Sequence, residues 1–356
     1  MLSVEISGVK YDTFKSVSVT KSINVVCSEF YLVMTSKNIS NYPIKVQSEI
    51  VIRLDDTTIL TGYIDKLDVD YADGRHEISA YGRSRTSVLV DSSVINRSFN
   101  TPISLVNLFK NVISGIGSDL KVVNKSGVNP VFSENVVAQV GESCFSFLDR
   151  FCKKAQVMMS TDENGDVLLL RGDTTFTGKI LQHEIGKDTN NVLTSGTSFD
   201  NSQRYRNYIV YTQAVEDEES SNENQATQKG LAFDTYMREG RSLVIVSETD
   251  TTLETVKQRA FWEANIRRAR SLIYKCTVQG FKDNTGALYN INKQINVLDD
   301  FVDIRGLMLV NSVTFTLSNS GSFTQLELLP PDAYSLKASR DKLEQLDNDL
   351  GDGLSD

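Results

Sequence analysis

A pair of glycine-bounded segments near residue 70 constrains the fold of this chain more than any other feature. Thr61–Asp65 leads into residues 67–72, where apolar and polar side chains alternate with the two-residue period of a half-buried strand. Asp73-Gly74 comes next, and both residue types tolerate the positive φ of a tight turn. Residues 76–81 alternate again and end at Gly82, in a Gly-Arg-Ser-Arg corner. The sequence therefore predicts a β-hairpin here.

Composition and charge exclude several classes of protein. The chain has 356 residues, of which 40% are hydrophobic and 23% are charged, and this length suits two or three domains. The net charge of −9 and the pI near 5.0 argue against a protein that grips nucleic acid, because phosphate contacts need a basic surface. A channel through which nucleic acid only passes stays compatible with this charge. No apolar run approaches the ~18 residues of a membrane span, so we expect no membrane insertion.

The sequence pattern of the first half of the chain changes near residue 95, from alternating strand-like runs to helical ones. In residues 1–94, Val17 and Val19 alternate with hydroxyl residues, and further runs of this kind predict a β-rich domain. Residues 95–172 combine two helical stretches with a strand–turn–strand signal around Asn164-Gly165. We therefore predict a first β domain at 1–94 and a small α/β insert domain at 95–172.

Two helices are predicted in the insert. Thr101-Pro102 is a suitable helix start, and apolar residues at three- and four-residue spacing follow over 105–113. Ser143 precedes the second helix, whose apolar stripe runs over 145–152. Lys153-Lys154 fall in its last turn, where cations complement the helix dipole.

The second half returns to strands. We predict a second β domain at 173–334, interrupted by an acidic loop at 214–230 and a long helix at 251–272. The helix opens with the capping-box sequence Thr251–Glu254, in which two side chains satisfy free backbone amides. The acidic loop suits a mobile surface segment or an electrostatic docking site. Residues 335–356 form a predicted C-terminal tail, and the fold class is mainly β with an α/β insert.

Catalytic and metal-binding signals are sparse. The four cysteines show no Cys-x-x-Cys spacing and suit free, packed thiols. His76 and His183 are the two histidines, and neither has a second ligand at metal spacing or a Gly-x-Ser-x-Gly elbow nearby. Glu134, Glu142 and Glu184 would serve a cell-wall glycosidase by position alone. We therefore expect no cofactor, no metal and no enzymatic activity, with a cell-wall hydrolase as the minor alternative.

Several short segments occur in an order typical of one family of phage proteins. They are Thr61–Asp65, Tyr81–Arg83, Leu89–Ser93, Gly141–Ser143, Phe147–Arg150, Asn164-Gly165, Asn191–Leu193, Ser202–Tyr205, Tyr208–Val210, Arg238–Arg241, Arg259–Glu263 and Leu328–Tyr334. Taken together they resemble the Mu-like baseplate hub proteins of contractile phage tails, over residues 1–334. One departure is Gly280-Phe281-Lys282, where relatives commonly carry Gly-Trp-Arg.

The resemblance implies a structural protein of the virion tail baseplate that is assembled in the host cytoplasm. Such hubs are homotrimers in which each chain carries two tail-tube-like β-barrel domains, here 1–94 and 173–334. Six tube-like domains then match a threefold central spike to a sixfold tail tube and let DNA pass. The implied partners are the spike, the tail tube or a tube-initiator protein, and baseplate wedge proteins. The alternative is the hub of a related injection machine, of the type VI or long-tail kind.

Two groups of residues are candidates for contacts in such an assembly. Arg267, Arg268 and Arg270 end the long helix, where they compensate the helix dipole or line a channel or interface. Four leucines of the tail could lie on one helical face and dock on a partner, unless the tail is a solvated chain end. These leucines are Leu336, Leu343, Leu346 and Leu350.

Overall fold

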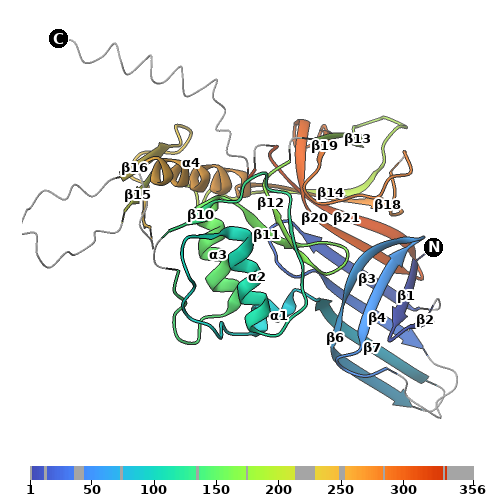
Figure 1. Cartoon of the computed structure of the whole chain (residues 1–356). Helices are drawn as coiled ribbons and strands as arrows, with labels where there is room; N and C mark the ends of the chain where they lie inside the picture. The colour runs from blue at the N-terminus through green and yellow to red at the C-terminus, as the bar shows by residue number, and fades with distance from the viewer. Residues whose placement is uncertain are drawn as a thin grey trace, which may run out of the picture. The chain divides into compact units, whose positions relative to one another are not determined.

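We describe the chain from a computed structural model (Figure 1). The structure describes residues 2–11, 14–35, 44–72, 75–133, 136–173, 175–212, 229–247, 253–283, 285–331 and 333–334. These residues fall into two compact units, which are treated separately. The first unit contains the described residues within 1–171, 175–197 and 274–328, and the second contains those within 172–173, 198–273 and 329–334.

The N-terminal strands of the first unit form one half of a large sheet. Apolar side chains alternate along β3 (Ser16–Ser22), so Val17 and Val19 are fully buried while the residues on either side of them are half-buried and face the other way. The strands are β1 (Leu2–Ile6), β2 (Val9–Tyr11), β3 (Ser16–Ser22), β4 (Glu29–Thr35), β5 (Glu49–Leu54), β6 (Thr57–Ala72) and β7 (Arg75–Ser84).

The predicted hairpin is β6–β7, and its glycines allow the two strands to approach closely. A Cβ atom on Gly62 would lie 2.0 Å from the carbonyl oxygen of Arg83, and one on Gly82 would lie 2.0 Å from that of Tyr63. A β-bulge shifts the register between Ile64 and Lys66. Glycine at these two positions therefore permits a backbone contact that no other residue would allow.

The C-terminal strands of the first unit complete the same sheet. Its strand order is β14-β18-β21-β20-β3-β4-β7-β6-β5-β1-β2, and β13 joins through β19, which pairs with β20. In the described residues this path does not close on itself, so the sheet is open. The added strands are β13 (Phe176–His183), β14 (Val192–Phe199), β18 (Leu272–Gln279), β19 (Gln294–Asp299), β20 (Ile304–Ser318) and β21 (Gly321–Leu329).

The middle of the first unit is a small α/β region with its own core. Helices α2 and α3 lie side by side and bury Phe109, Phe147 and Phe151 with the strands around them (Figure 1). Ser143 caps α3, since its hydroxyl accepts a hydrogen bond from the Ser146 amide. The elements are α1 (Ser87–Asp91), β8 (Ile103–Ser104), α2 (Leu105–Gly115), β9 (Val122–Asn124), β10 (Val131–Phe132), α3 (Cys144–Ala155), β11 (Met158–Thr161) and β12 (Val167–Leu170).

The second unit contains a three-stranded sheet with a helix on one face. Its strands β15 (Asn207–Tyr211), β16 (Lys229–Phe233) and β17 (Ser242–Val246) have the order β16-β15-β17, and α4 (Leu253–Arg270) packs against β15 and β16. A Cβ atom on Gly230 would lie 2.2 Å from the carbonyl oxygen of Val256, so this glycine allows the helix to lie close to the sheet.

Two expectations from the sequence need correction. The hairpin strand is half-buried only in its first part, because Val69 and Tyr71 are 46% and 78% exposed. The first helix of the insert begins at Leu105 and is capped by Ser104, since Thr101-Pro102 precedes strand β8. In the described residues the strand path of the large sheet is open, and the two tail-tube-like β-barrel domains stay a prediction. Mainly β architecture with a small α/β region is confirmed, whereas the domain boundaries stay a prediction.

Candidate interaction surfaces

Strands β3 and β20 place a double row of hydroxyl side chains at the centre of the large sheet. The four cross-strand pairs are all Ser or Thr, and all eight residues are half-buried. Thr20 and Thr314 form one pair, with their hydroxyl oxygens 3.0 Å apart. We call this set the hydroxyl seam; its pairs are Ser16–Ser318, Ser18–Thr316, Thr20–Thr314 and Ser22–Ser312.

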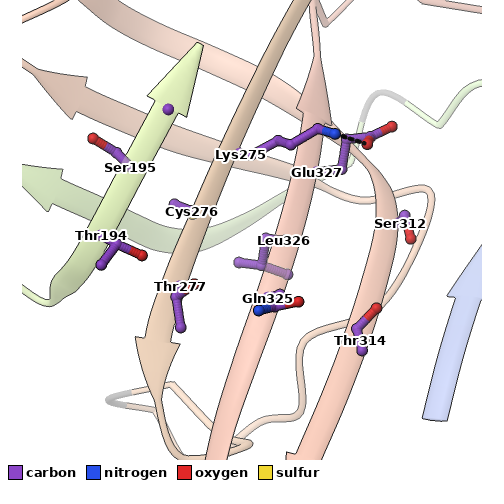
Figure 2. A pocket seen from close by; sticks show the side chains of 11 residues that line it. Thr194, Ser195, Lys275, Cys276, Thr277, Ser312, Thr314, Gln325, Leu326 and Glu327 are labelled. Atoms are coloured by element: carbon purple, nitrogen blue, oxygen red, sulfur yellow. Dashed lines mark ion pairs between the residues drawn. The ribbon is translucent and has the colours of Figure 1, made fainter. Parts of the chain in front are cut away.

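A shallow hollow of about 400 Å³ continues the seam across β20, β21, β18 and β14. Figure 2 shows that the side chains around it are mostly small and polar, including Thr194, Thr277 and Gln325. Lys275 is the cation in the hollow, and its ammonium lies 3.4 Å from a carboxylate oxygen of Glu327 (Figure 2). The hollow therefore carries a matched ion pair among neutral groups and offers no cluster of unpaired charge.

The other side of the seam is aromatic and then acidic. Tyr31 of β4 is the cross-strand neighbour of Ser18, is 46% exposed, and donates a hydrogen bond from its hydroxyl to the Ser79 oxygen. Ser79 is paired with Asp68 on β6. Arg83 also lies on β7, and its guanidinium binds the carboxylates of Asp65 and Asp91. Arg83 is therefore engaged by two carboxylates and is not available to bind a phosphate.

The three predicted arginines lie at the end of α4 in the second unit. The Arg267 guanidinium packs over the ring of Tyr205, 5.5 Å from its centroid, and donates to the carbonyl oxygen of Gln203 at 3.4 Å. It also lies 3.5 Å from the carboxylate of Glu263. Arg267 thus stabilises its own unit, while Arg270 is exposed. Whether this group also faces a channel or an interface stays a prediction.

His183 lies in a Ser–His–Asp cluster that sequence reasoning did not find. Its Nδ1 atom is 3.0 Å from the Ser195 hydroxyl and 3.3 Å from Oδ2 of Asp299. The Tyr274 hydroxyl donates to the same Oδ2 at 2.8 Å. In a catalytic triad the serine and the aspartate contact opposite ring nitrogens, whereas here they share one. His183 therefore does not connect Asp299 to Ser195 as a catalytic base. The cluster joins four strands, with Asp299 and Tyr274 buried and with His183 and Ser195 at the surface.

Burial and hydrogen bonding oppose each other at Asp299. Burial raises the pKa of its carboxyl, but hydrogen bonds from Tyr274, Ser195, His183 and the Phe301 amide outweigh this effect. The net result is a pKa below the ordinary value for aspartate, so the carboxylate stays ionised. Burial also raises the pKa of Tyr274, and its hydrogen bond to Asp299 adds to the rise.

The glutamates considered for a hydrolase are engaged in ion pairs or lie outside the described residues. The Arg150 guanidinium binds both oxygens of Glu142, each at 2.9 Å. Glu184 pairs with Arg305 at 3.2 Å, and Glu134 lies outside the described residues. Within the described ranges, no three His, Cys, Asp or Glu side chains are grouped to hold a metal ion. None of the helices in this part of the chain is long and apolar enough to cross a membrane.

Other predicted features can be placed only in part. The four cysteines are free and buried, as expected. The turn at Asp73-Gly74, most of the acidic loop, Thr251 and the tail leucines lie outside the described residues. Docking by Leu336, Leu343, Leu346 and Leu350 therefore stays a prediction.

Comparison with known proteins connects both ends of the chain to one family. Residues 1–84 match the N-terminal domain described for Mu phage baseplate assembly protein GpP-like proteins. Residues 251–337 match the fourth domain of the Mu phage baseplate assembly protein GpP. These segments contain β3 and β20, the two strands of the hydroxyl seam.

Whole-chain similarities agree with these matches. The chain is 21% identical to the baseplate hub protein gp44 of Escherichia phage Mu over 369 aligned residues, which cover 99% of this chain and 94% of gp44. The 43 kDa tail protein of prophage MuSo2 from Shewanella oneidensis is 25% identical, with a TM-score of 0.79 over 94% of this chain and 99% of that one.

A more distant likeness extends the fold beyond phage tails. The E. coli c3393 protein, a component of the type VI secretion system, is 12% identical, with a TM-score of 0.58 over 92% of this chain and 76% of that chain. At this identity the likeness concerns the fold. The domain matches and the full-length similarities together show that the chain is similar to Mu-like baseplate hub and tail proteins along most of its length.

Proposed function

We propose that the protein is a trimeric adaptor that joins the tail tube to the central spike and lets DNA pass through its centre. One observation carries this proposal: the two segments that match separate family domains are joined edge to edge in one sheet, through β3 and β20. Each chain thus presents two sheet modules as one continuous surface. Three such chains would supply six modules, which suits a threefold spike and a sixfold tube.

The open ends of the sheet support ring formation. The main strand path ends at β2 on one side and at β14 on the other, and the side branch through β19 ends at β13. Unpaired edge strands bind other strands readily, and proteins usually cover them. When one edge of a chain meets the opposite edge of the next chain, the contact is heterologous and generates a ring if the rotation closes. A trimer would therefore cover the β2 and β14 edges of every chain.

The charge distribution supports passage of DNA without stable binding. The chain has a net charge of −9, and cations of the large sheet such as Lys275 and Arg83 are paired with carboxylates. Stable binding to duplex DNA depends on cations that replace the counterions of the phosphates. The arginines at the end of α4 test this part of the proposal. Submicromolar duplex binding at near-physiological salt that is lost on replacing Arg267, Arg268 and Arg270 would contradict it.

The oligomeric state tests the adaptor role directly. We expect the mass of a trimer in solution at micromolar concentration and physiological salt, and a ring with a central opening in negative-stain class averages. A strictly monomeric or dimeric protein, alone and mixed with its spike partner, would contradict the proposal.

Substitutions at the sheet edges sharpen this test. Val9 of β2 and Leu193 of β14 are 55% and 51% exposed, so Val9→Lys or Leu193→Lys should fold and place a charge in the contact. We expect both variants to shift the mass toward the monomer. Val140→Lys is the matched control, because Val140 is 80% exposed in the α/β region and should leave the trimer intact.

The same hub is proposed to contact the tail tube or a tube initiator, and baseplate wedge proteins, after assembly in the host cytoplasm. Co-purification of tagged protein from lysates of induced host cells would identify these partners. Recovery of cell-wall hydrolase activity, measured by zymography on purified cell walls, would instead favour an enzymatic role.

A further inference from the structure

The hydroxyl seam has a composition that solubility alone does not require. Its eight side chains contain no lysine, glutamate or other charged group, although they face away from the core on two central strands. On the opposite face of the same strands Val19 and Phe315 are buried. The outward residues are therefore short, neutral and held in fixed cross-strand pairs.

Such a surface binds a polyanion poorly. Non-specific affinity for DNA comes almost entirely from lysine and arginine contacts to phosphates. Serine and threonine hydroxyls that bind a phosphate only exchange a hydrogen bond that water would make for one with the phosphate, so the net gain is small. Threonine is also stiff about χ1, so its side chain cannot reach far out from the sheet. The nearest cation of the hollow, Lys275, is matched by Glu327 at 3.4 Å.

We propose that the hydroxyl seam and the adjoining hollow form the wall of the central channel, and that their neutral hydroxyls allow duplex DNA to move past without being held. This inference rests on the proposed function, because it needs the ring. Beyond the proposed function, this inference specifies which face of the sheet lines the channel and why that face binds DNA weakly. The occupant is duplex DNA in transit, for which neither a cation cluster nor an apolar groove is present on the seam.

Thiol labelling of the assembled ring tests the location of the seam. Thr316→Cys and Ser18→Cys each place one thiol on the seam, and the four native cysteines are buried, so background labelling should be low. The solution mass is measured first. The ring is then treated with a small maleimide or with a maleimide carried by a polymer too large to enter the channel. Val140→Cys is the exposed control, which should react with both reagents.

The outcomes separate the two proposals. We expect the seam thiols to react with the small reagent and to be protected from the large one in the ring. Equal reaction with both reagents would place the seam on the outer surface, and no reaction with either would place it in a protein interface. Both results overturn the inference while leaving the trimer intact. A mass that stays monomeric would instead contradict the proposed function.

A gain of DNA binding tests the chemistry. Thr316→Lys with Thr277→Lys adds two cations per chain on this face, and thus six per ring. We expect duplex binding to appear, with a salt dependence of log affinity that is steeper by about 0.9 for each phosphate contacted. Paired Lys substitutions at the exposed Val140 and Tyr71 add the same charge elsewhere. Equal binding by both variants would show that net charge matters and the position on the seam does not.

Discussion

Replacing Gly82 by alanine should separate the two strands of the central hairpin. The added Cβ would lie 2.0 Å from the carbonyl oxygen of Tyr63 and 2.5 Å from Cζ of Phe30. Optimal contacts between carbon atoms are ~3.5 Å or longer, so the clash exceeds ~1 Å. Because one obstructing atom belongs to the backbone, a change of side-chain rotamer cannot relieve it, and β6 must move away from β7.

The size of the effect follows from the contacts that this movement breaks. Overpacking a well-packed site costs ~1–3 kcal/mol and occasionally more, and each ladder hydrogen bond lost adds ~1 kcal/mol. We therefore expect Gly82→Ala to lower the free energy of local opening of this hairpin by at least ~3 kcal/mol. That value corresponds to amide exchange that is faster by more than ~100-fold.

Hydrogen exchange measured by mass spectrometry on peptides covering residues 57–84 provides the assay, since a chain with two units need not unfold in one step. Gly196→Ala is the matched control. Gly196 is also a strand glycine, but a Cβ there meets no atom within 4 Å. In the Gly196→Ala variant we expect the amide exchange rates of residues 57–84 to change by less than threefold. Similar protection in the two variants would refute the close-approach explanation for the hairpin glycines.

Three further predictions concern the joint at His183, the thiols and the tail. The pKa of Asp299 is lowered on folding, so the stability that it contributes is present above its unfolded pKa of ~3.9 and is lost as pH falls through its folded value. Asp299→Asn should therefore flatten the acid side of a plot of melting temperature against pH, and an unchanged slope would contradict this. Burial raises the pKa of Cys27 to about 11 and that of Cys276 to about 12, so native protein should not react with a thiol reagent at pH 8, while unfolded protein should expose four thiols. Truncation after Tyr334 should leave the trimer intact and weaken one partner contact. Particles that assemble and contract equally well without the tail would exclude docking by its leucines.

Features encoded by neighbouring residues were predicted well from the sequence. The helix capped by Ser143, with Lys153 and Lys154 in its last turn, follows from local rules of capping and period, and the structure confirms it. The turn between β11 and β12 was found for the same reason. In contrast, α2 begins three residues after Thr101-Pro102, where backbone pairing of the short strand β8 decides the start.

Features that depend on distant pairing could not be predicted. The alternation of Ser16, Ser18 and Thr20 with valines identified β3 as a strand, but nothing local indicates that its partner is β20. The His183 cluster has the same origin, because its four side chains come from four strands. A search for matched hydroxyl alternation in residues 16–22 and 312–318 would have been the available signal for the seam.

The pairing of β3 with β20 also has a consequence for synthesis of the protein. Thr20 and Thr314 are 294 residues apart, so β3 leaves the ribosome long before its partner exists. At translation rates of ~5–20 residues per second, this edge waits for roughly 15–60 s. During that time it is a template for pairing with other nascent chains. Production of soluble protein should therefore depend on chaperone capacity and growth temperature more strongly than the finished sheet would suggest.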